Sequence, residues 1–257
     1  MCYQLATVIV VIPCYNEAER LDERQVRALL AFEGTRVLFV DDGSTDGTAD
    51  RLAALCAAVG YRASFDVLPE NRGKAEAVRR GMQLALNRAE KLGDAIVGYI
   101  DADFATPPAE VVRLKDELVR SEALVALGSR VARLGAAIDR KPARHYLGRA
   151  FATTASFVLG LTVYDTQCGA KLFRDTPALR AALEAPFSSR WSFDVELLGR
   201  LLAGGLAPTE MIEVPLSQWE DVGGSKLSTK GALRAGVDLI TLGARVRRRG
   251  RRGFFPD

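Results

Sequence analysis

The chain has 257 residues, of which 48% are hydrophobic and 26% charged, and its formal net charge is +3. This composition is that of an ordinary globular protein, and the length allows one large α/β domain or two small ones. The four cysteines are far apart and form no C-x-x-C pair, which excludes a zinc ribbon and indicates reduced thiols. No apolar run approaches the roughly 18 residues of a membrane-spanning helix, so any membrane association is expected to be peripheral.

Strands and helices are predicted to alternate over the first half of the chain. Thr7–Ile12 is a continuous β-branched run, which is typical of a strand buried on both faces of a parallel sheet. Further strands are predicted at 37–40, 63–68, 95–100 and 124–127. Helices are predicted around Leu21–Leu30, from Ser44 or Thr45 as cap to about Val59, from Asn71–Lys74 to about Ala89, and from Thr106 onward. The alternation predicts an α/β fold with a doubly wound, mostly parallel sheet flanked by helices.

The second half is expected to add C-terminal amphipathic helices. Positions 140–160 predict a helix whose apolar face carries Leu147, Phe151, Thr154, Val158 and Leu161. Strands are predicted at 167–173 and 210–214, and helices at 193–202 and 229–248. No internal repeat or clear linker interrupts the chain, which favours one domain with a C-terminal elaboration.

Four loops with unusual sequences follow the predicted strands. They are Pro13–Glu17, Asp41–Ser44, Asp101–Asp103 and Gly128–Arg130. Right-handed crossovers place the carboxyl ends of parallel strands on one edge of a sheet, where folds of this class bind ligands. The four loops are therefore expected to lie together and to form a site.

Asp101 and Asp103 follow a predicted buried strand, with the small residue Ala102 between them. Carboxylates at such a place are costly to bury without a partner. Their hard oxygen atoms suit Mg²⁺ or Mn²⁺, which commonly take one or two carboxylates together with phosphate oxygens. The plainer interpretation is a loop start in which Asp103 caps the next helix.

Other loops offer groups that suit a nucleotide. Asp42 can accept hydrogen bonds from a base or ribose, Tyr15 can lie flat against a base, and Asn71–Lys74 places two cations at a helix N-terminus. Each also has a plainer interpretation, as a capped turn or a solvated helix start.

The Walker and G-x-G-x-x-G fingerprints are absent, and the single histidine, His145, has no G-x-S-x-G partner motif. These absences argue against a dehydrogenase and a Ser-His-Asp hydrolase.

In order and spacing, the motifs V-I-P-C-Y-N-E, V-D-D-G-S-T-D-G-T, N-R-G-K and D-A-D resemble those of glycosyltransferase family 2, which has the GT-A fold. Blocks at Gly128–Arg130, Asp165–Phe173, Arg190–Leu198 and Gly224–Leu227 resemble the dolichyl-phosphate glucosyltransferases of that family and, a little less, its dolichol-phosphate mannose synthases. The resemblance covers about residues 6–245.

The resemblance implies a single GT-A glycosyltransferase domain over residues 1–257. Its nucleotide-sugar-binding half would be 1–130 and its acceptor half 131–245, followed by a basic tail at 246–257. The implied reaction is an inverting transfer of a hexose from a nucleotide-sugar to a polyprenyl or dolichyl phosphate.

The resemblance, together with the loop chemistry, assigns expected site residues. Those expected to hold the nucleotide-sugar are Pro13, Tyr15, Glu17, Val40, Asp42, Lys74, Asp101, Ala102 and Asp103. Asp101 and Asp103 would bind Mg²⁺ or Mn²⁺, and the acceptor phosphate would meet Arg130, Arg144 and Lys226. The expected catalytic residues are Asp103 and Arg130, with Asp194 or Glu196 as the base if the acceptor is a hydroxyl.

Two departures from the mannose synthases favour UDP-glucose over GDP-mannose as donor. Those enzymes typically carry an arginine where this chain has Glu220 and a glutamine where it has Ala105. The run D-A-D-F-A-T and the block D-T-Q-C-G resemble the glucosyl enzymes instead. Transfer of mannose from GDP-mannose is the alternative.

Basic residues crowd the C-terminus and flank the helix predicted at 140–160. Such clusters attract an anionic membrane surface, so a cytoplasmic protein with peripheral contact at the inner membrane face is expected. A soluble family 2 enzyme with a hydroxyl acceptor and a nucleotide-sugar-binding module without turnover are alternatives. A nucleic-acid binder is a further one, but no interleaved aromatic pattern or known module supports it, so no nucleic-acid partner is expected.

Overall fold

The structure is a computed structural model that describes residues 7–93, 95–139, 142–190 and 192–221. In the helix that begins at position 142, residues 142–147 and 150 are described by their backbone alone.

Seven of the strands in the described residues form one mixed sheet in the order β3-β2-β1-β4-β7-β5-β8. They are β1 (Thr7–Cys14), β2 (Thr35–Asp41), β3 (Ala63–Val67), β4 (Ala95–Tyr99), β5 (Val125–Ser129), β7 (Lys171–Arg174) and β8 (Met211–Pro215). All pair in parallel except β7, which runs antiparallel between β4 and β5. Two short strands, β6 (Ala137–Asp139) and β9 (Gln218–Glu220), form a separate parallel pair. The mostly parallel α/β sheet predicted from the sequence is thus confirmed.

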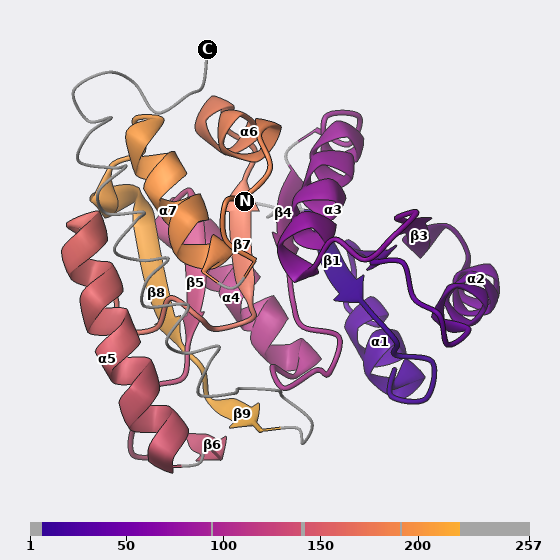
Figure 1. The fold of residues 1–257 in the computed structure, drawn as a ribbon, viewed down its shortest axis with the longest axis horizontal. Coiled ribbons are helices and arrows are strands. Elements are labelled where there is room, and N and C mark those ends of the chain that lie inside the picture. Colours follow the sequence, from indigo (N-terminus) through magenta and orange to yellow (C-terminus); the bar gives the residue numbers. More distant parts are fainter. Residues whose placement is uncertain (1–6, 94, 140–141, 191, 222–257) are drawn as a thin grey trace.

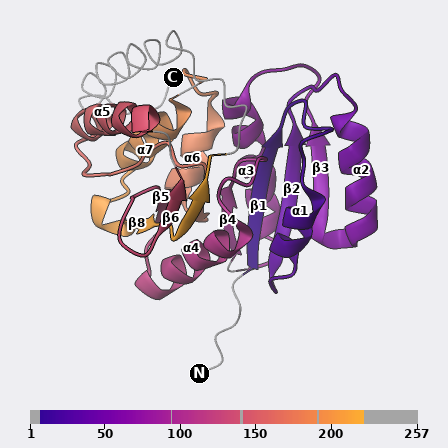
Figure 2. The ribbon, with the colours of Figure 1, turned by 90° about the horizontal axis from the view of Figure 1, so that it is seen from below.

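Helices cover both faces of this sheet (Figure 1). They are α1 (Glu23–Leu30), α2 (Thr48–Val59), α3 (Lys74–Ala89), α4 (Pro108–Ser121), α5 (Pro142–Leu159), α6 (Pro177–Glu184) and α7 (Phe193–Ala203), with short 3-10 turns η1 (Gly60–Arg62) and η2 (Pro208–Glu210). One apolar core joins the sheet to α3, α5, α6 and α7, and the other joins it to α1, α2 and α4. Figure 2 shows the sheet running from β3, beside α2, toward β8 at the far end.

The β-branched sequence of β1 explains this layering. Ile9 and Val11 belong to the core on the α3 side, whereas Val8, Val10 and Ile12 belong to the opposite core. Because successive strand residues point to opposite faces, a strand covered on both sides is apolar throughout.

Helix α3 lies unusually close to the sheet. A Cβ at Gly81 would be 2.3 Å from a methyl group of Val11 and 2.8 Å from one of Val40. Glycine at this position therefore brings α3, and the loop that begins it, close to the carboxyl ends of β1 and β2.

The start of α2 differs from the prediction. Neither Ser44 nor Thr45 caps it; the N-cap is Gly47, with φ of +84°, and Asp46 accepts a hydrogen bond from Thr48 N at 3.1 Å. Ser44 is occupied elsewhere, because its hydroxyl contacts Asp41 and accepts a hydrogen bond from Asn16 N at 2.9 Å. Ser44 therefore ties loops together instead of capping.

The buried face of α5 matches the predicted one only in part. Phe151 packs against the core and Leu161, just after the helix, is buried, but Thr154 is exposed. The prediction missed Ala152, Ala155 and Leu159, which are also buried. Small alanines suit this face because α5 packs against α7.

Strands β6 and β9 and helix α6 were not predicted, and β7 begins at Lys171 rather than Gln167. The helix predicted at 229–248 lies outside the described residues. Within the described part of the chain, every helix is too short or too polar to traverse a lipid bilayer.

Candidate active site

The structure brings the four predicted loops to the carboxyl edge of the sheet. Asp42 N donates to Cys14 O at 2.8 Å and Asn16 N to Ser44 Oγ at 2.9 Å, so the loops after β1 and β2 touch. Asn16 and Phe104 adopt positive φ values of 53° and 51°. Such backbone conformations are uncommon outside glycine and gather at functional loops.

Lys74, the first residue of α3, contacts the carboxylate of Asp101 with its ammonium group. Desolvation alone would raise the pKa of Asp101, but the charge and hydrogen bond of Lys74 outweigh it and lower that pKa. Desolvation likewise opposes the charged form of Lys74, yet the carboxylates of Asp101 and Asp194 raise its pKa. Both partners are therefore ionised, and a positive charge lies against the D-A-D segment.

Asp103 is the less restrained of the two carboxylates. One of its oxygens accepts a hydrogen bond from Ala105 N at 3.0 Å. Burial raises the pKa of Asp103, and the charge of Asp101 raises it further. On the other side, Gly169 lies so close that a Cβ there would be 2.3 Å from an oxygen of Asp101. A side chain at position 169 would thus intrude on the carboxylate pair.

This pair of carboxylates fits a divalent cation that completes its shell elsewhere. Among the described residues no group of three or more His, Cys, Asp or Glu side chains could hold a metal ion. Asp101 and Asp103 would accordingly share Mg²⁺ or Mn²⁺ with oxygens of a bound ligand, as magnesium does at phosphate sites. The ammonium of Lys74 against Asp101 indicates that this place accommodates a positive charge.

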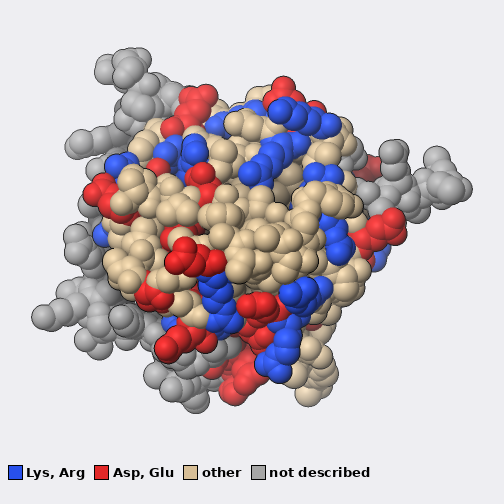
Figure 3. All heavy atoms as spheres, turned by 90° about the vertical axis from the view of Figure 1, so that its right-hand side faces the viewer, with Lys and Arg blue, Asp and Glu red and all other residues tan. Residues whose placement is uncertain are grey.

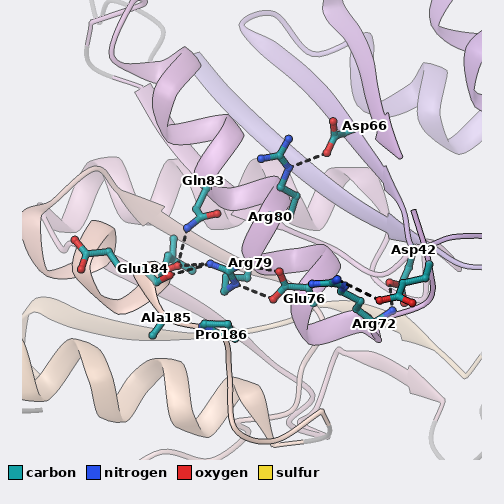
Figure 4. A network of polar contacts seen from close by, with 12 residues as sticks. Asp42, Asp66, Arg72, Glu76, Arg79, Arg80, Gln83, Glu184, Ala185 and Pro186 are labelled. Carbon is teal, nitrogen blue, oxygen red and sulfur yellow. Dashed lines mark hydrogen bonds and ion pairs between the residues drawn. The ribbon is translucent and has the colours of Figure 1, made fainter. Parts of the chain in front are cut away.

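Asp42 organises the loop that begins α3. Its carboxylate accepts hydrogen bonds from Arg72 N and Gly73 N at 2.8 Å each and from Asn71 Nδ2 at 3.1 Å (Figure 4). Burial raises the pKa of Asp42, while the two backbone N–H groups lower it. Both oxygens therefore have partners within the protein, and Asp42 fixes the loop that presents Lys74.

The other residues predicted to contact the nucleotide differ in how far they are exposed to solvent. The ring of Tyr15 is 46% exposed, whereas Val40 is fully buried in the sheet beside Pro13. Only the backbone of Val40 could face a ligand. Glu17 keeps a buried Oε2 atom without a hydrogen-bond partner among the described residues. Ala102 is buried between the two carboxylates.

Arg130, at the end of β5, forms a two-point ion pair with Asp165 at 2.6 and 2.8 Å. Its guanidinium carbon lies 5.3 Å from the centre of the Trp219 ring. Glu213 accepts a hydrogen bond from Asp165 N at 2.7 Å and so fixes Asp165, the ion-pair partner of Arg130. Burial opposes the charge of Arg130, but Asp165 raises its pKa above the usual range. Arg130 is thus a rigidly held cation.

Asp194 lies at the start of α7 and is engaged by buried groups. Lys171 Nζ, whose side chain is fully buried, is 2.6 Å from Asp194 Oδ1, and the hydroxyl of Tyr99 donates to the same oxygen. Burial raises the pKa of Tyr99 and the charge of Asp194 raises it further, which keeps the hydroxyl protonated. These contacts join α7 to β4 and β7 below the site.

Glu196 holds a neighbouring segment in place. Its carboxylate accepts from Ser188 N at 2.9 Å and pairs with Arg200 at 2.7 Å, and Arg200 also donates to Ala185 O and Pro186 O. None of these contacts involves the D-A-D segment. The structure therefore does not bring Glu196 to the other predicted site residues.

The segment held by Glu196 meets the loop before α3. Arg190 Nε donates to Arg72 O at 2.9 Å, and a Cβ at Gly73 would be 2.8 Å from the same nitrogen. Nearby, Arg79 of α3 donates to the carbonyls of Leu183 and Glu184 at 3.0 Å each (Figure 4). The two halves of the chain are thus tied together at the edge of the site.

Several residues of this arrangement were missed by sequence reasoning. They are Tyr99, Asp165, Gly169, Lys171 and Arg190. All except Tyr99 lie in the blocks 165–173 and 190–198, where charged residues interrupt apolar sequence. That interruption was the available signal. Of the predicted acceptor residues, Lys226 and the side chain of Arg144 lie outside the described residues.

Buried polar atoms without a hydrogen-bond partner gather at this edge. Within the described residues they are Glu17 Oε2, Asp41 Oδ2, Ser129 Oγ, Thr166 Oγ1 and Gln167 Nε2. All five lie at the carboxyl ends of strands or in adjoining loops. An unsatisfied buried group costs about 1–3 kcal/mol. Their concentration here indicates an edge built for a polar ligand.

Comparison with known proteins shows the family of the chain. The family model for glycosyl transferase family 2 matches residues 9–179, which include the four loops after β1, β2, β4 and β5. A dolichyl-phosphate beta-glucosyltransferase of Trichomonas vaginalis is 32% identical over 90% of this chain and 69% of its own length. A polyprenol monophosphomannose synthase of Mycolicibacterium smegmatis is 30% identical over 93% of this chain and 88% of its own.

A solved structure has the same fold. It is the glucosyl-3-phosphoglycerate synthase of Mycobacterium tuberculosis, in complex with Mn²⁺, UDP-glucose and phosphoglyceric acid. It superposes with a TM-score of 0.64 at 20% identity and covers 93% of this chain and 80% of its own. The agreement confirms the predicted GT-A arrangement.

Proposed function

Because the chain belongs to glycosyl transferase family 2 and is a glycosyltransferase, we propose that it moves glucose from UDP-glucose to a polyprenyl phosphate, inverting the anomeric carbon. The observation that supports this most is the D-A-D segment at the carboxyl edge, where Lys74 contacts Asp101 and the charge of the fixed cation Arg130 also lowers the pKa of Asp101. Two cations near one carboxylate pair suit a diphosphate and a second phosphate.

On the donor side, the chain supplies charge and surface for a nucleotide diphosphate. Lys74 stands at the N-terminus of α3, where backbone N–H groups and an ammonium favour phosphate. Tyr15 offers an exposed ring to the base. Glu17 Oε2, which has an ion pair with Arg20 but no hydrogen bond among the described residues, can accept from a hydroxyl or ring N–H. Asp101 and Asp103 would hold Mg²⁺ or Mn²⁺, which when bound neutralises charge on the departing diphosphate.

On the acceptor side, the reaction needs residues that position the acceptor phosphate and needs no general base. A phosphate monoester is already anionic near neutral pH, so it needs alignment rather than deprotonation. Arg130 can supply this alignment because Asp165 and Trp219 fix its orientation. Arg144 and Lys226 are proposed as further phosphate contacts. The two contacts that Asp194 Oδ1 accepts make this residue a poor general base.

The acceptor assignment rests on the two relatives, whose names specify dolichyl and polyprenol phosphate respectively. The proposal includes one GT-A domain over residues 1–257 and peripheral contact with an anionic membrane through the basic C-terminal residues.

The donor assignment is supported by a contact in the structure. Glu220 N donates to Ala105 O at 3.1 Å, so the two positions that depart from the mannose synthases are neighbours. Ala105 N in turn donates to Asp103. Changes of residue at these two positions would therefore act together on the segment that contacts Asp103.

A donor panel tests this assignment. Purified protein is supplied with polyprenyl phosphate, Mg²⁺ or Mn²⁺, and either radiolabelled UDP-glucose or GDP-mannose. We expect transfer from UDP-glucose to be faster by about tenfold or more, the usual scale for a pocket that distinguishes related substrates. Transfer from GDP-mannose alone would establish the mannosyl alternative, which the relative at 30% identity supports.

A further inference from the structure

A cavity lies at the edge of the sheet opposite the candidate active site. Its volume is about 300 Å³, and its rim carries Arg36 at the start of β2, Arg62 in η1, and Arg88 and Lys91 at the end of α3. Helix α3 links the two edges, because its first residue, Lys74, belongs to the donor side. We refer to this cavity, defined by its four cations, as the basic pocket.

Within the described residues, none of the four cations of the basic pocket lies within 4.0 Å of a carboxylate. Most arginines whose side chains the structure describes do form such pairs. Three come from positions far apart in sequence, and the fold gathers them on one hollow. Like charges that line one pocket repel one another, and an anion between them relieves the repulsion.

Three contacts indicate that the arginines of the basic pocket are held rather than free to turn away. Arg62 donates to Leu30 O at 2.5 Å, and Arg88 donates to the hydroxyl of Ser64. The guanidinium of Arg36 lies 5.7 Å from the centre of the Tyr61 ring. Each arginine has five N–H donors, and these contacts leave others available for a ligand.

The end of α3 explains only part of this cluster. Cations at a helix C-terminus complement the helix dipole, which accounts for Arg88 and Lys91. Arg36 and Arg62 belong to other elements, so the dipole of α3 does not explain their positions. Acidic and basic side chains are interspersed over the neighbouring end of the molecule at β3 and α2 (Figure 3). The basic pocket is therefore a local feature and not part of a broad basic face.

The lining of the pocket also indicates the kind of anion. Ile9 and Val37, almost fully buried, contribute apolar surface, and the ring of Tyr61 is 82% exposed at the rim. Arginines around such a lining suit a phosphate group that carries an apolar or ring-shaped part.

We propose that the basic pocket binds a phosphate-bearing ligand at the edge of the sheet opposite the donor site. The phosphate could belong to a soluble compound or to the headgroup of an anionic lipid, and both use the same contacts. The inference stands on four cations that the fold gathers on one pocket and that have no carboxylate partner in the described part of the chain, and it does not depend on the transfer reaction.

The test compares two double variants that remove equal charge. Arg36→Ala/Arg88→Ala alters the basic pocket, and the control Arg27→Ala/Arg120→Ala removes two exposed arginines from α1 and α4. Inorganic pyrophosphate is titrated calorimetrically at low ionic strength, where screening is weak. We expect the pocket variant to lose one binding event or weaken it by at least about tenfold, and the control to bind as the parent does.

A vesicle arm distinguishes the two sources of phosphate. The protein is sedimented with phosphatidylcholine vesicles that contain phosphatidylserine. If lipid headgroups are the ligand, a smaller fraction of the pocket variant than of the parent sediments with the vesicles, and the control sediments as the parent does. Lys91→Ala serves as a second variant, because Lys91 lines the pocket but makes no hydrogen bond or ion pair through its side chain with another described residue. Equal behaviour of pocket and control variants in both arms would overturn the proposal, whether both bind normally or both weaken.

Discussion

Replacing Asp103 with asparagine is expected to lower the rate of sugar transfer by about 10²- to 10³-fold, the usual scale for losing one group that stabilises developing charge. Asparagine keeps an oxygen that can accept the 3.0 Å hydrogen bond from Ala105 N, so the loop should retain its shape. What it loses is the second negative charge beside Asp101, and with it the affinity for a divalent cation. Thermal stability should change little.

The measurement is initial-rate transfer at saturating donor, with thermal denaturation of the same samples. Asp50→Asn is the matched control, because Asp50 is an exposed residue of α2. Transfer by Asp103→Asn at the parental rate, with the fold intact, would remove Asp103 from the reaction.

Replacing Asp194 with asparagine is expected to destabilise the protein by about 3–5 kcal/mol, the usual cost of breaking a buried ion pair by removing one partner. Lys171 is fully buried and would lose the carboxylate that lies 2.6 Å from its Nζ atom. Tyr99 would lose the strong acceptor of its hydroxyl proton. The loss should appear as a lower midpoint in chemical denaturation.

The double variant Asp194→Asn/Lys171→Met separates a structural role from a catalytic one. Methionine removes the stranded charge, so the double variant should be more stable than Asp194→Asn alone and should recover part of the transfer rate. If Asp194 were a general base, Asp194→Asn would lose activity without losing stability, and the second substitution would restore nothing.

The positions of the strands could be predicted because their sequences are strongly apolar. Thr7–Ile12 and the run before Asp101 have no polar interruption, and a parallel sheet then dictates that their carboxyl ends meet. The site could be located for the same reason. That Asp101 and Asp103 lie at this edge follows from strand direction alone.

The partners of the site residues could not be predicted in this way. The ion pair between Lys171 and Asp194 forms because β7 runs antiparallel between β4 and β5. The sequence of the four residues of β7 does not indicate the direction of the strand. Asp165 was within a noted block, but its pairing with Arg130 spans 35 positions. Such contacts arise from topology and not from local sequence.

Short elements were missed for a related reason. Strand β9 has three residues and pairs with β6, also of three, so neither carries a detectable period. Glu110 holds β9 by accepting hydrogen bonds from Ser217 N and Gln218 N at 3.1 and 3.2 Å. A buried carboxylate on a distant helix thus determines where Trp219 meets Arg130.

The most direct test of the proposed function follows the label from UDP-glucose. The purified protein is incubated with radiolabelled UDP-glucose and Mn²⁺, with and without a polyprenyl phosphate, and the products are partitioned between organic solvent and water. The account predicts label in an acid-labile glycolipid that forms only when the lipid is present and that Asp103→Asn fails to produce. Label that appears in water-soluble products at the same rate with or without the lipid would contradict it.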